Sequence, residues 1–435
     1  MTICKTNETG EGETFAGFFV SGGELQIGTI QGMIEAVIPT ERENTMKFLH
    51  LGDLHLGKRV YGYSMLDDQR FALEQVIRMA TENQVDAVVL AGDIYDKTVP
   101  SGEAVSLFDW FFTQLCEQAI TVLAVSGNHD SGERLDFGKT LLSQQGMHLV
   151  GTLDETVASV TLADQQGCRV QFHLLPWLRP MEWREKWNLT ESTQQCVMQE
   201  ALKRAAWEQD VRHVLIAHTF VTVGGVMPEQ SDSEILPVGG IDAVDAALFD
   251  AYDYVALGHI HRPQRLGRDS VRYCGSLLKY SFSEARYPKS VPLVTINQIG
   301  EAEITLLPLA PKRDLRELRG KLQDVVSDLV QQAGNPNDYL RVILTDDEEL
   351  YDPQAALRAA YPNLMRLDFD NIRTQTANAE GLQREEAARQ LTPVQLFEQF
   401  FLEQNGKPMT AWQKQQILRI GREMEASDEA DSFDN

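Results

Sequence analysis

Aspartate, histidine and asparagine side chains recur along this chain in short clusters, and these residue types bind divalent metal ions. The clusters contain, in chain order, Asp53, His55, Asp93, Asn128, His129, Asp130, His218, His259 and His261. Carboxylate and amide oxygens together with imidazole nitrogens suit manganese, iron or catalytic zinc, and the absence of cysteine argues against a closed structural zinc site. Two such ions about 3.5–4 Å apart activate water and stabilise the attacking and leaving oxygens of a displacement at phosphorus. The residue types therefore predict a two-metal centre that hydrolyses phosphoesters.

Each cluster follows a short apolar run, which is how buried parallel strands read in a sequence. The runs are 48–51, 87–91, 121–125, 214–217 and 254–257. Segments of helical length, such as 67–83 and 103–118, lie between them, so we expect an α/β fold whose strand ends bring the clusters into one crevice. Asp53 and His55 are two residues apart on a segment expected to be extended, so both side chains should point to the same side. A single such motif would be weak evidence, because a Gly-Asp pair after a strand is often only a turn.

The order Asp-x-His, Gly-Asp, Gly-Asn-His-Asp, a single histidine and Gly-His-x-His resembles the calcineurin-like metallophosphoesterase superfamily. Within that superfamily, residues 46–57, 92–96, 258–264 and 275–284 are similar to the SbcD family of nuclease subunits. The resemblance implies an α/β fold, with a metallophosphoesterase β-sandwich flanked by helices, a small α/β capping domain and a C-terminal helix pair. It also implies the metal ligands, which would be Asp53, His55, Asp93 and His261 for one ion and Asp93, Asn128, His218 and His259 for the other. Asp93 would then bridge the two ions, the alternative being that it caps the helix that follows.

His129 directly follows the ligand Asn128 and is the candidate catalytic residue. Near a phosphodiester it could orient the phosphate or protonate the leaving oxygen, which suits an imidazole, and the family that the chain resembles uses this histidine in that way. Asp96 could orient the imidazole of His129, or it could cap the helix expected after Pro100. Arg262 could bind a phosphate or pair with a nearby carboxylate.

The remaining histidines and the tryptophans are expected to serve packing. Histidines without ligand-type neighbours are His50, His148, His173 and His213. Four tryptophans lie between the Gly-Asn-His-Asp motif and His218, namely Trp177, Trp183, Trp187 and Trp207. Beside Arg179 and Arg184 they could stack on unpaired bases, but packing of a helical insertion onto the core is favoured. Residues 224–234 are expected to form a mobile loop over the site.

The composition fits a globular protein of two or three domains. The chain has 435 residues, of which 43% are hydrophobic, and no apolar run of about 18 residues that would span a bilayer. Its five cysteines are scattered and never spaced Cys-x-x-Cys, so we expect no disulfide framework and a cytoplasmic location. The net charge of −25 argues against a DNA-binding surface. Bound divalent ions, acidic residues far from the cleft and a partner subunit would weaken that argument.

The pattern also divides the chain into segments. These are an extension (1–45), the nuclease domain (46–310), the α/β capping domain (311–370), a linker (371–390), a helix pair for partner docking (391–425) and an acidic tail (426–435). The extension is expected to be disordered or to reflect an upstream start, with a short strand pair as the alternative. In the capping domain the expected order is helix 315–332, strand 339–344, helix 353–360 and strand 364–369. The helix pair carries apolar side chains that could pack on the core or dock on a partner.

The resemblance implies a function that composition and spacing do not give. It implies a manganese-dependent nuclease with exonuclease and endonuclease activity on double-stranded DNA ends and hairpins, in DNA repair, recombination and replication. It further implies an SbcC-like, SMC-type ATPase as partner and a homodimer within a heterotetramer. The alternative is a small-molecule phosphodiesterase or phosphatase of the same superfamily, which the acidic charge favours. A third interpretation, a scaffold with a vestigial metal site, conflicts with the complete set of ligand residues.

Overall fold

Two six-stranded sheets form the centre of the protein in the computed structural model, which describes residues 16–21, 24–29, 45–164, 167–234, 243–371, 393–405 and 407–417. The first sheet has the order β18 (Ala302–Pro308), β17 (Ser290–Asn297), β3 (Thr45–Leu51), β6 (Ala87–Ala91), β7 (Thr121–Val125) and β8 (Met147–Val150). Strands β3, β6, β7 and β8 are parallel, and β17 and β18 extend the sheet in antiparallel fashion. The second sheet has the order β15 (Gln264–Leu266), β16 (Arg268–Tyr273), β14 (Tyr254–Gly258), β11 (Arg212–His218), β10 (Arg169–Leu175) and β9 (Ala158–Ala163). Here β10, β11, β14 and β16 are parallel.

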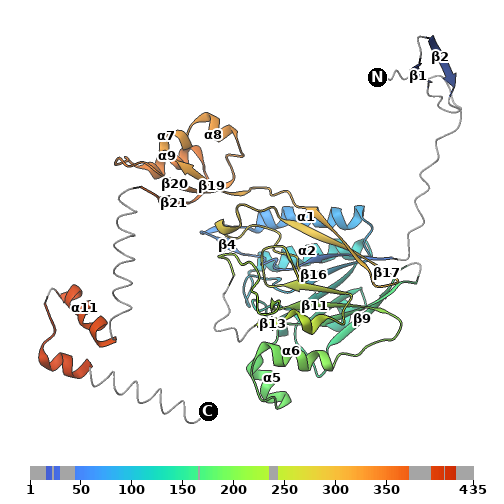
Figure 1. Ribbon diagram of the computed structural model, residues 1–435, viewed down its shortest axis with the longest axis horizontal. Helices are drawn as coiled ribbons and strands as arrows, with labels where there is room; N and C mark the ends of the chain where they lie inside the picture. Colours follow the sequence, from blue (N-terminus) through green and yellow to red (C-terminus); the bar gives the residue numbers. More distant parts are fainter. Residues whose placement is uncertain are drawn as a thin grey trace.

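The two sheets pack face to face, and helices cover their outer faces (Figure 1). Between the sheets, the ring of Phe48 makes edge contacts with Phe172 at 5.4 Å and with Tyr254 at 5.6 Å between centroids. Alternate residues of β3, such as Leu49, face the other way, into a core shared with α1 (Leu66–Glu82) and α2 (Gly102–Glu117). The outer face of the second sheet is covered by α5 (Pro180–Trp187) and α6 (Gln194–Lys203). The sandwich flanked by helices is therefore confirmed.

The helices that follow β3 and β6 lie within one residue of the expected ranges 67–83 and 103–118. In α2, the hydroxyl of Ser101 accepts a hydrogen bond from the backbone N–H of Ala104 and so caps the helix. Phe108, Phe111 and Leu115 then form a buried stripe at helical spacing.

A three-stranded parallel sheet follows the sandwich, made of β19 (Leu315–Gly320), β20 (Tyr339–Leu344) and β21 (Leu364–Phe369). Its helices are α7 (Leu322–Val325), α8 (Asp328–Gln332) and α9 (Pro353–Ala360). The prediction of one helix over 315–332 is wrong in its first third, because residues 315–320 pair with β20 as a strand. The three-residue spacing of Leu315 and Leu318 fits one face of a helix and would place the two side chains on opposite faces of a strand, and pairing with the buried strand β20 outweighs it.

Two strands and two helical segments lie outside the two compact units. The strands β1 (Ala16–Ser21) and β2 (Glu24–Thr29) pair in antiparallel fashion, which is the alternative that the sequence left open for residues 1–45. The helix α11 (Pro393–Asn405) lies within the segment 391–425 expected to form a helix pair, and residues 411–417 are also helical. The rest of the second predicted helix, most of the linker and the acidic tail lie outside the described residues. In the part of the chain that is described, no helix has the length and apolarity needed to cross a membrane.

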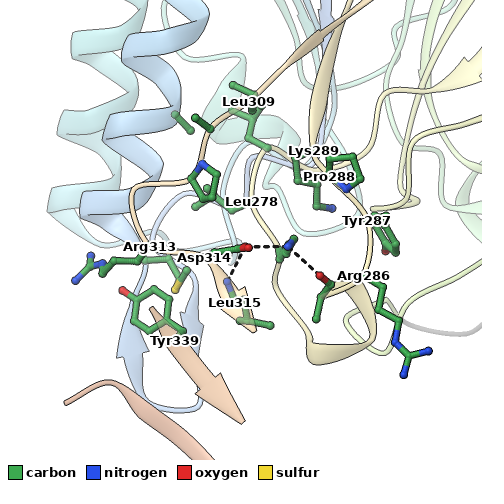
Figure 2. Close-up of a pocket in the computed structure, with 17 residues that line it drawn as sticks. Leu278, Arg286, Tyr287, Pro288, Lys289, Leu309, Arg313, Asp314, Leu315 and Tyr339 are labelled. Atoms are coloured by element: carbon green, nitrogen blue, oxygen red, sulfur yellow. Dashed lines mark hydrogen bonds and ion pairs between the residues drawn. The ribbon is translucent and has the colours of Figure 1, made fainter. Parts of the chain in front are cut away.

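The joint between the sandwich and the small sheet is held by a buried carboxylate. Asp68 of α1 is fully buried and accepts hydrogen bonds from Arg313 Nε at 3.0 Å and from the Tyr339 hydroxyl at 2.9 Å. A cavity of about 240 Å³ lies at this joint, walled by Leu278, Leu309 and other side chains of both units (Figure 2). The Lys279 ammonium donates to the carboxylate of Asp314 at 2.8 Å. The same carboxylate accepts from the backbone N–H of Leu315 (Figure 2).

Replacing Asp68 with asparagine is expected to destabilise this joint by roughly 3 kcal/mol, because the guanidinium of Arg313 loses its counter-charge in a largely buried site. Urea unfolding of the two proteins measures the difference. Asp67→Asn is the matched control, because Asp67 lies in the same helical turn but is less buried than Asp68. Equal unfolding midpoints for Asp68→Asn and the control would contradict the role of the ion pair.

Candidate metal centre

All seven predicted metal ligands lie at the carboxyl ends of five strands, where the two sheets meet. Asp53 and His55 follow β3, Asp93 follows β6 and Asn128 follows β7, so the first sheet supplies four of the seven. The second sheet supplies the others, with His218 at the end of β11 and both His259 and His261 after β14. The strand-end argument from the sequence therefore brings these side chains to one place.

The backbone around several ligands is left-handed, and the prediction of an extended segment at Asp53 and His55 is wrong. The φ angles are 51° at Asp53, 44° at His55, 50° at Asp93 and 107° at His259. The backbone N–H groups of Asp53 and His55 donate to the carbonyls of Gly92 at 3.0 Å and of Asp93 at 2.9 Å. Residues other than glycine rarely adopt this conformation, and it concentrates at functional sites where the surroundings impose it.

Two glycines allow the strand ends to approach one another. A Cβ atom on Gly258 would lie 1.9 Å from the carbonyl oxygen of Ala91, and one on Gly92 would lie 2.4 Å from His218 Nδ1. The Gly-Asp and Gly-His pairs of the sequence thus mark a close backbone approach as well as a ligand.

Replacing Gly258 with alanine is expected to cost about 1–3 kcal/mol of stability and to impair metal binding, because the added methyl must push Ala91 away from His218. Thermal unfolding and calorimetric manganese titration measure the two effects. Gly102→Ala serves as the control, since its added Cβ would meet no atom within 4 Å. Unchanged manganese binding by Gly258→Ala would contradict the close-packing argument.

Two imidazole nitrogens face each other in one half of the site. Asp53, His55 and His261 each offer a ligand atom, all within 4.8 Å of one another, and the Nε2 atoms of the two histidines are 3.0 Å apart. The Nδ1 atom of His261 lies 2.7 Å from the hydroxyl of Ser233, and Nδ1 of His55 lies 3.7 Å from the carboxylate of Asp96. If both Nδ1 atoms carry the proton, both Nε2 atoms present lone pairs to the same point, which suits a shared cation.

The other half brings together four more acceptor atoms. His218 Nδ1 donates to the carbonyl of Ala91 at 2.8 Å, so its Nε2 presents a lone pair. That Nε2 lies 2.9 Å from Asn128 Oδ1, 3.3 Å from His259 Nδ1 and 3.4 Å from Asp93 Oδ2. With the facing ring nitrogens of His218 and His259 unprotonated, these atoms have no hydrogen to share at such distances, and a divalent cation would satisfy all of them.

The electrostatics of the site also favour cations. Burial lowers the pKa of His259 to about 3 and holds the pKa values of His55 and His261 well below their usual range, so these imidazoles are neutral near pH 7. Burial raises the pKa of Asp53 to about 7, and the charge of neighbouring Asp93 contributes to the rise. Burial lowers the pKa of His218, but the charges of Asp93 and Asp53 outweigh this and raise that pKa to about 9, so a proton on His218 supplies positive charge to these carboxylates when no ion is bound. Divalent ions would supply that charge in its place. The residues present therefore fit two metal ions.

Comparison with known proteins also indicates a phosphoesterase. A model of the calcineurin-like phosphoesterase family matches residues 46–263, and a model described as the type 5 capsule protein repressor C-terminal domain, SbcD_C, matches residues 311–405. The chain is 32% identical over 325 residues to the D subunit of the nuclease SbcCD of Staphylococcus epidermidis, and the match covers 74% of this chain and 85% of that one. This chain belongs to the SbcD family of calcineurin-like phosphoesterases.

Solved structures also resemble this SbcD-family chain. TT1561 of Thermus thermophilus is 16% identical and covers 60% of this chain and 99% of its own, with a TM-score of 0.33. A dimetal phosphatase from Danio rerio is 12% identical and covers 61% of this chain and 99% of its own, with a TM-score of 0.34.

In this SbcD-family protein, the candidate catalytic histidine lies beside the ligands. The backbone N–H of His129 donates to Asp93 Oδ1 at 2.9 Å, and its ring meets that of His55 edge to face at 4.9 Å. The contact with Asp96 differs from the predicted one, since His129 Nδ1 lies 2.9 Å from the carbonyl oxygen of Asp96 and not from its carboxylate. The carboxylate pairs with Lys58 at 2.8 Å, and Ser101 instead of Asp96 caps the following helix.

Two more open questions from the sequence are answered by contacts. Arg262 forms an ion pair with Glu229 and lies over the ring of Tyr287. Asp130 accepts hydrogen bonds from the backbone N–H groups of Ile94, Tyr95 and Gly127 and so organises the loops around the ligands.

Three of the four tryptophans pack against other side chains, and the fourth contacts a predicted metal ligand. Trp183 and Trp187 contact each other at 4.4 Å between centroids, and Trp207 lies against His213 at 4.0 Å, as expected for packing. Trp177 is different, because its ring stacks on His259 at 5.9 Å with 24° between the planes. Its backbone N–H donates to the carbonyl of Ser126 at 3.0 Å, directly before the Gly-Asn-His-Asp motif.

Sequence reasoning missed the residues that hold the Asp53–His55 turn. The amide of Gln69 donates to the carbonyls of His55 at 2.7 Å and Leu54 at 3.2 Å, and the hydroxyl of Tyr280 donates to Leu54 at 2.6 Å. The motif 275–284, which contains Tyr280, was the available signal. Gln69 gave no signal, because it reads as an ordinary helix residue.

Proposed function

We propose that this protein is a divalent-metal-dependent DNA nuclease that acts as the SbcD-like subunit of a complex with an SbcC-like, SMC-type ATPase. The observation that carries the proposal is the convergence of carboxylate, amide and imidazole acceptors from both sheets on one point. The similarity to the D subunit of the Staphylococcus epidermidis nuclease SbcCD supports DNA as the proposed substrate.

In this proposal, Asp53, His55, Asp93 and His261 hold one ion, and Asp93, Asn128, His218 and His259 hold the other. When bound, the two ions supply Lewis acidity for water activation and for the charge that develops on the phosphate oxygens. The protein fixes these ligands by backbone contacts such as the bond from the His259 N–H to Asp53 Oδ1 at 2.8 Å. Manganese is the proposed ion, since mixed oxygen and nitrogen ligation suits it.

His129 is the proposed proton donor to the leaving group. As water adds to phosphorus and the bond to the sugar oxygen breaks, that oxygen needs a proton. The carbonyl of Asp96 occupies His129 Nδ1, so Nε2 is the nitrogen that would serve the substrate, and it can donate a proton only from the imidazolium form, in which both ring nitrogens carry hydrogen. The ions held by the ligand cluster would stabilise the charge on the phosphate oxygens, and His129 would supply the proton.

A partner is part of the proposal because the chain is acidic. With a net charge of −25, DNA binding by this chain alone is expected to be weak and sensitive to salt. The proposed docking surface for the ATPase is the helix pair, where Phe397, Phe400 and Trp412 are 40%, 54% and 68% exposed. A homodimer within a heterotetramer, action in DNA repair, recombination and replication, and a cytoplasmic location complete the proposal.

The experiment is cleavage of a labelled DNA hairpin in manganese, with and without the ATPase partner and ATP, beside a small chromogenic phosphodiester. Manganese-dependent cleavage of the hairpin that becomes ATP-dependent with the partner is the expected result. Omission of manganese with a chelator present is the control. Turnover of the small diester with DNA intact under both conditions would instead identify a small-molecule phosphodiesterase.

A further inference from the structure

A buried group of polar side chains lies behind the ligand His261 and is not used by the chemistry described above. It consists of Ser233, Glu284 and Lys289, of which Glu284 is 0% and Lys289 is 5% exposed. Glu284 ends the motif 275–284, which the sequence singled out without a role. Ser233 comes from a different part of the chain, the segment 224–234.

The hydrogen bonds of this group fix where the proton of His261 lies. The hydroxyl of Ser233 is 2.7 Å from His261 Nδ1 and 2.8 Å from Glu284 Oε1. The hydroxyl of Ser231 also lies 2.7 Å from the Ser233 hydroxyl, and it donates to Glu234 Oε1 at 2.9 Å. A carboxylate only accepts, so with the Ser233 proton donated to Glu284 the serine oxygen accepts from the imidazole. His261 therefore carries its proton on Nδ1 and presents the lone pair of Nε2 toward His55 Nε2, 3.0 Å away.

Lys289 forms an ion pair with Glu284 and also holds the backbone of His261. Its ammonium donates to Glu284 Oε2 at 2.6 Å, to the carbonyl of His261 at 2.8 Å and to the hydroxyl of Ser276 at 2.9 Å. The N–H of His261 donates to Glu234 Oε1 at 2.7 Å. The ring, the carbonyl and the N–H of this ligand are thus all fixed by side chains.

We infer that Ser233, Glu284 and Lys289 form a positioning relay that sets the tautomer and orientation of His261, and through it the affinity for the ion on the Asp53–His55–His261 side. The inference rests on the proposed metal centre. The corresponding proton on His218 is held by the carbonyl of Ala91, which no side-chain substitution removes. Among the described residues, the Nδ1 partner of His261 is therefore a side chain that a substitution can remove, and the Nδ1 partner of His218 is not. A substitution in the relay should change the affinity for one ion and not for the other.

The test is a calorimetric titration of the metal-free protein with manganese. Ser233→Ala is expected to weaken binding of one ion by about 10- to 100-fold and leave the other unchanged, because His261 loses the acceptor for its Nδ1 proton. Ser233→Thr keeps the hydroxyl and is expected to restore wild-type affinity. Phosphodiester turnover by Ser233→Ala should require a higher manganese concentration than the wild type and should be nearly full at saturating manganese.

Ser281→Ala is the matched control. The hydroxyl of Ser281 donates to the same Glu284 oxygen at 3.1 Å but does not reach His261, so this variant should bind manganese like the wild type. Glu284→Gln is less informative, because it leaves the buried ammonium of Lys289 without a counter-charge and its folding must be checked by circular dichroism.

The possible outcomes distinguish a failure of the proposed relay from a failure of the proposed metal centre. Wild-type affinity for both ions in Ser233→Ala, or equal weakening in Ser233→Ala and Ser281→Ala, would overturn the relay while leaving the centre intact. A wild-type protein that binds no manganese at all would instead remove the proposed centre.

Discussion

Replacing Asp93 with alanine is expected to lower phosphodiester hydrolysis by about a thousandfold, or roughly 4 kcal/mol of transition-state stabilisation. Asp93 Oδ2 lies 3.6 Å from His55 Nε2 in one half of the site and 3.4 Å from His218 Nε2 in the other. In the proposed centre Asp93 would be the ligand shared by both ions, so its loss is expected to remove metal binding and not only to weaken one ion. Turnover of a DNA hairpin in excess manganese, together with manganese stoichiometry by calorimetry, measures the effect.

Two further variants make the Asp93 result specific. Asp93→Asn keeps the size of the side chain but halves its capacity to bridge, so it should also fail to bind two ions. Asp109→Ala removes an exposed carboxylate on α2, away from the ligands, and should behave like the wild type. A stoichiometry of two manganese ions in Asp93→Ala would exclude the bridging role.

Replacing His129 with glutamine is expected to reduce DNA cleavage by about 10²- to 10⁴-fold without changing manganese affinity, because a proton donor is lost and the ligands remain. The loss should depend on the leaving group. The nitrophenolate group of a nitrophenyl diester leaves without protonation, so hydrolysis of this diester should fall far less than hydrolysis of DNA. Comparing kcat for the two substrates at saturating manganese measures this dependence.

The control for His129 is His148→Gln, a half-buried histidine on β8 that no metal-binding group among the described residues contains. It should leave both reactions unchanged. Equal losses on DNA and on the nitrophenyl diester in His129→Gln would show that the histidine positions the phosphate instead of protonating the leaving oxygen. Loss of manganese binding would show that it is a ligand, as its place beside His55 and Asp93 allows.

The strands and the positions of the candidate ligands could be predicted because both depend on short stretches of local sequence. An apolar run followed by Asp, Asn or His marks a buried strand and its carboxyl end, and parallel strands bring such ends together without knowledge of register. The strand β19 could not be predicted in the same way. Its assignment depends on pairing with β20, and the three-residue spacing of Leu315 and Leu318 indicates a helix instead.

The supporting contacts could not be predicted because they join distant segments or use the backbone. Ser233, Glu284 and His261 meet only in the fold. The contact of Asp96 with His129 uses a carbonyl, which every residue has, so the side chain at position 96 carries no information about it. The left-handed turns at Asp53 and His55 were missed for a related reason, since no glycine at these positions marks them.

The strand order of the first sheet has a consequence for synthesis of the chain on the ribosome. β3 comes early, yet its antiparallel neighbour β17 is made only after the whole second sheet, with Leu49 paired to Leu293. His259 and His261 are also synthesised late. More than half of the domain must therefore be made before they can join Asp53 and His55. In the proposed centre, the full set of metal ligands would therefore be available only after β14 has been made, late in synthesis of the chain.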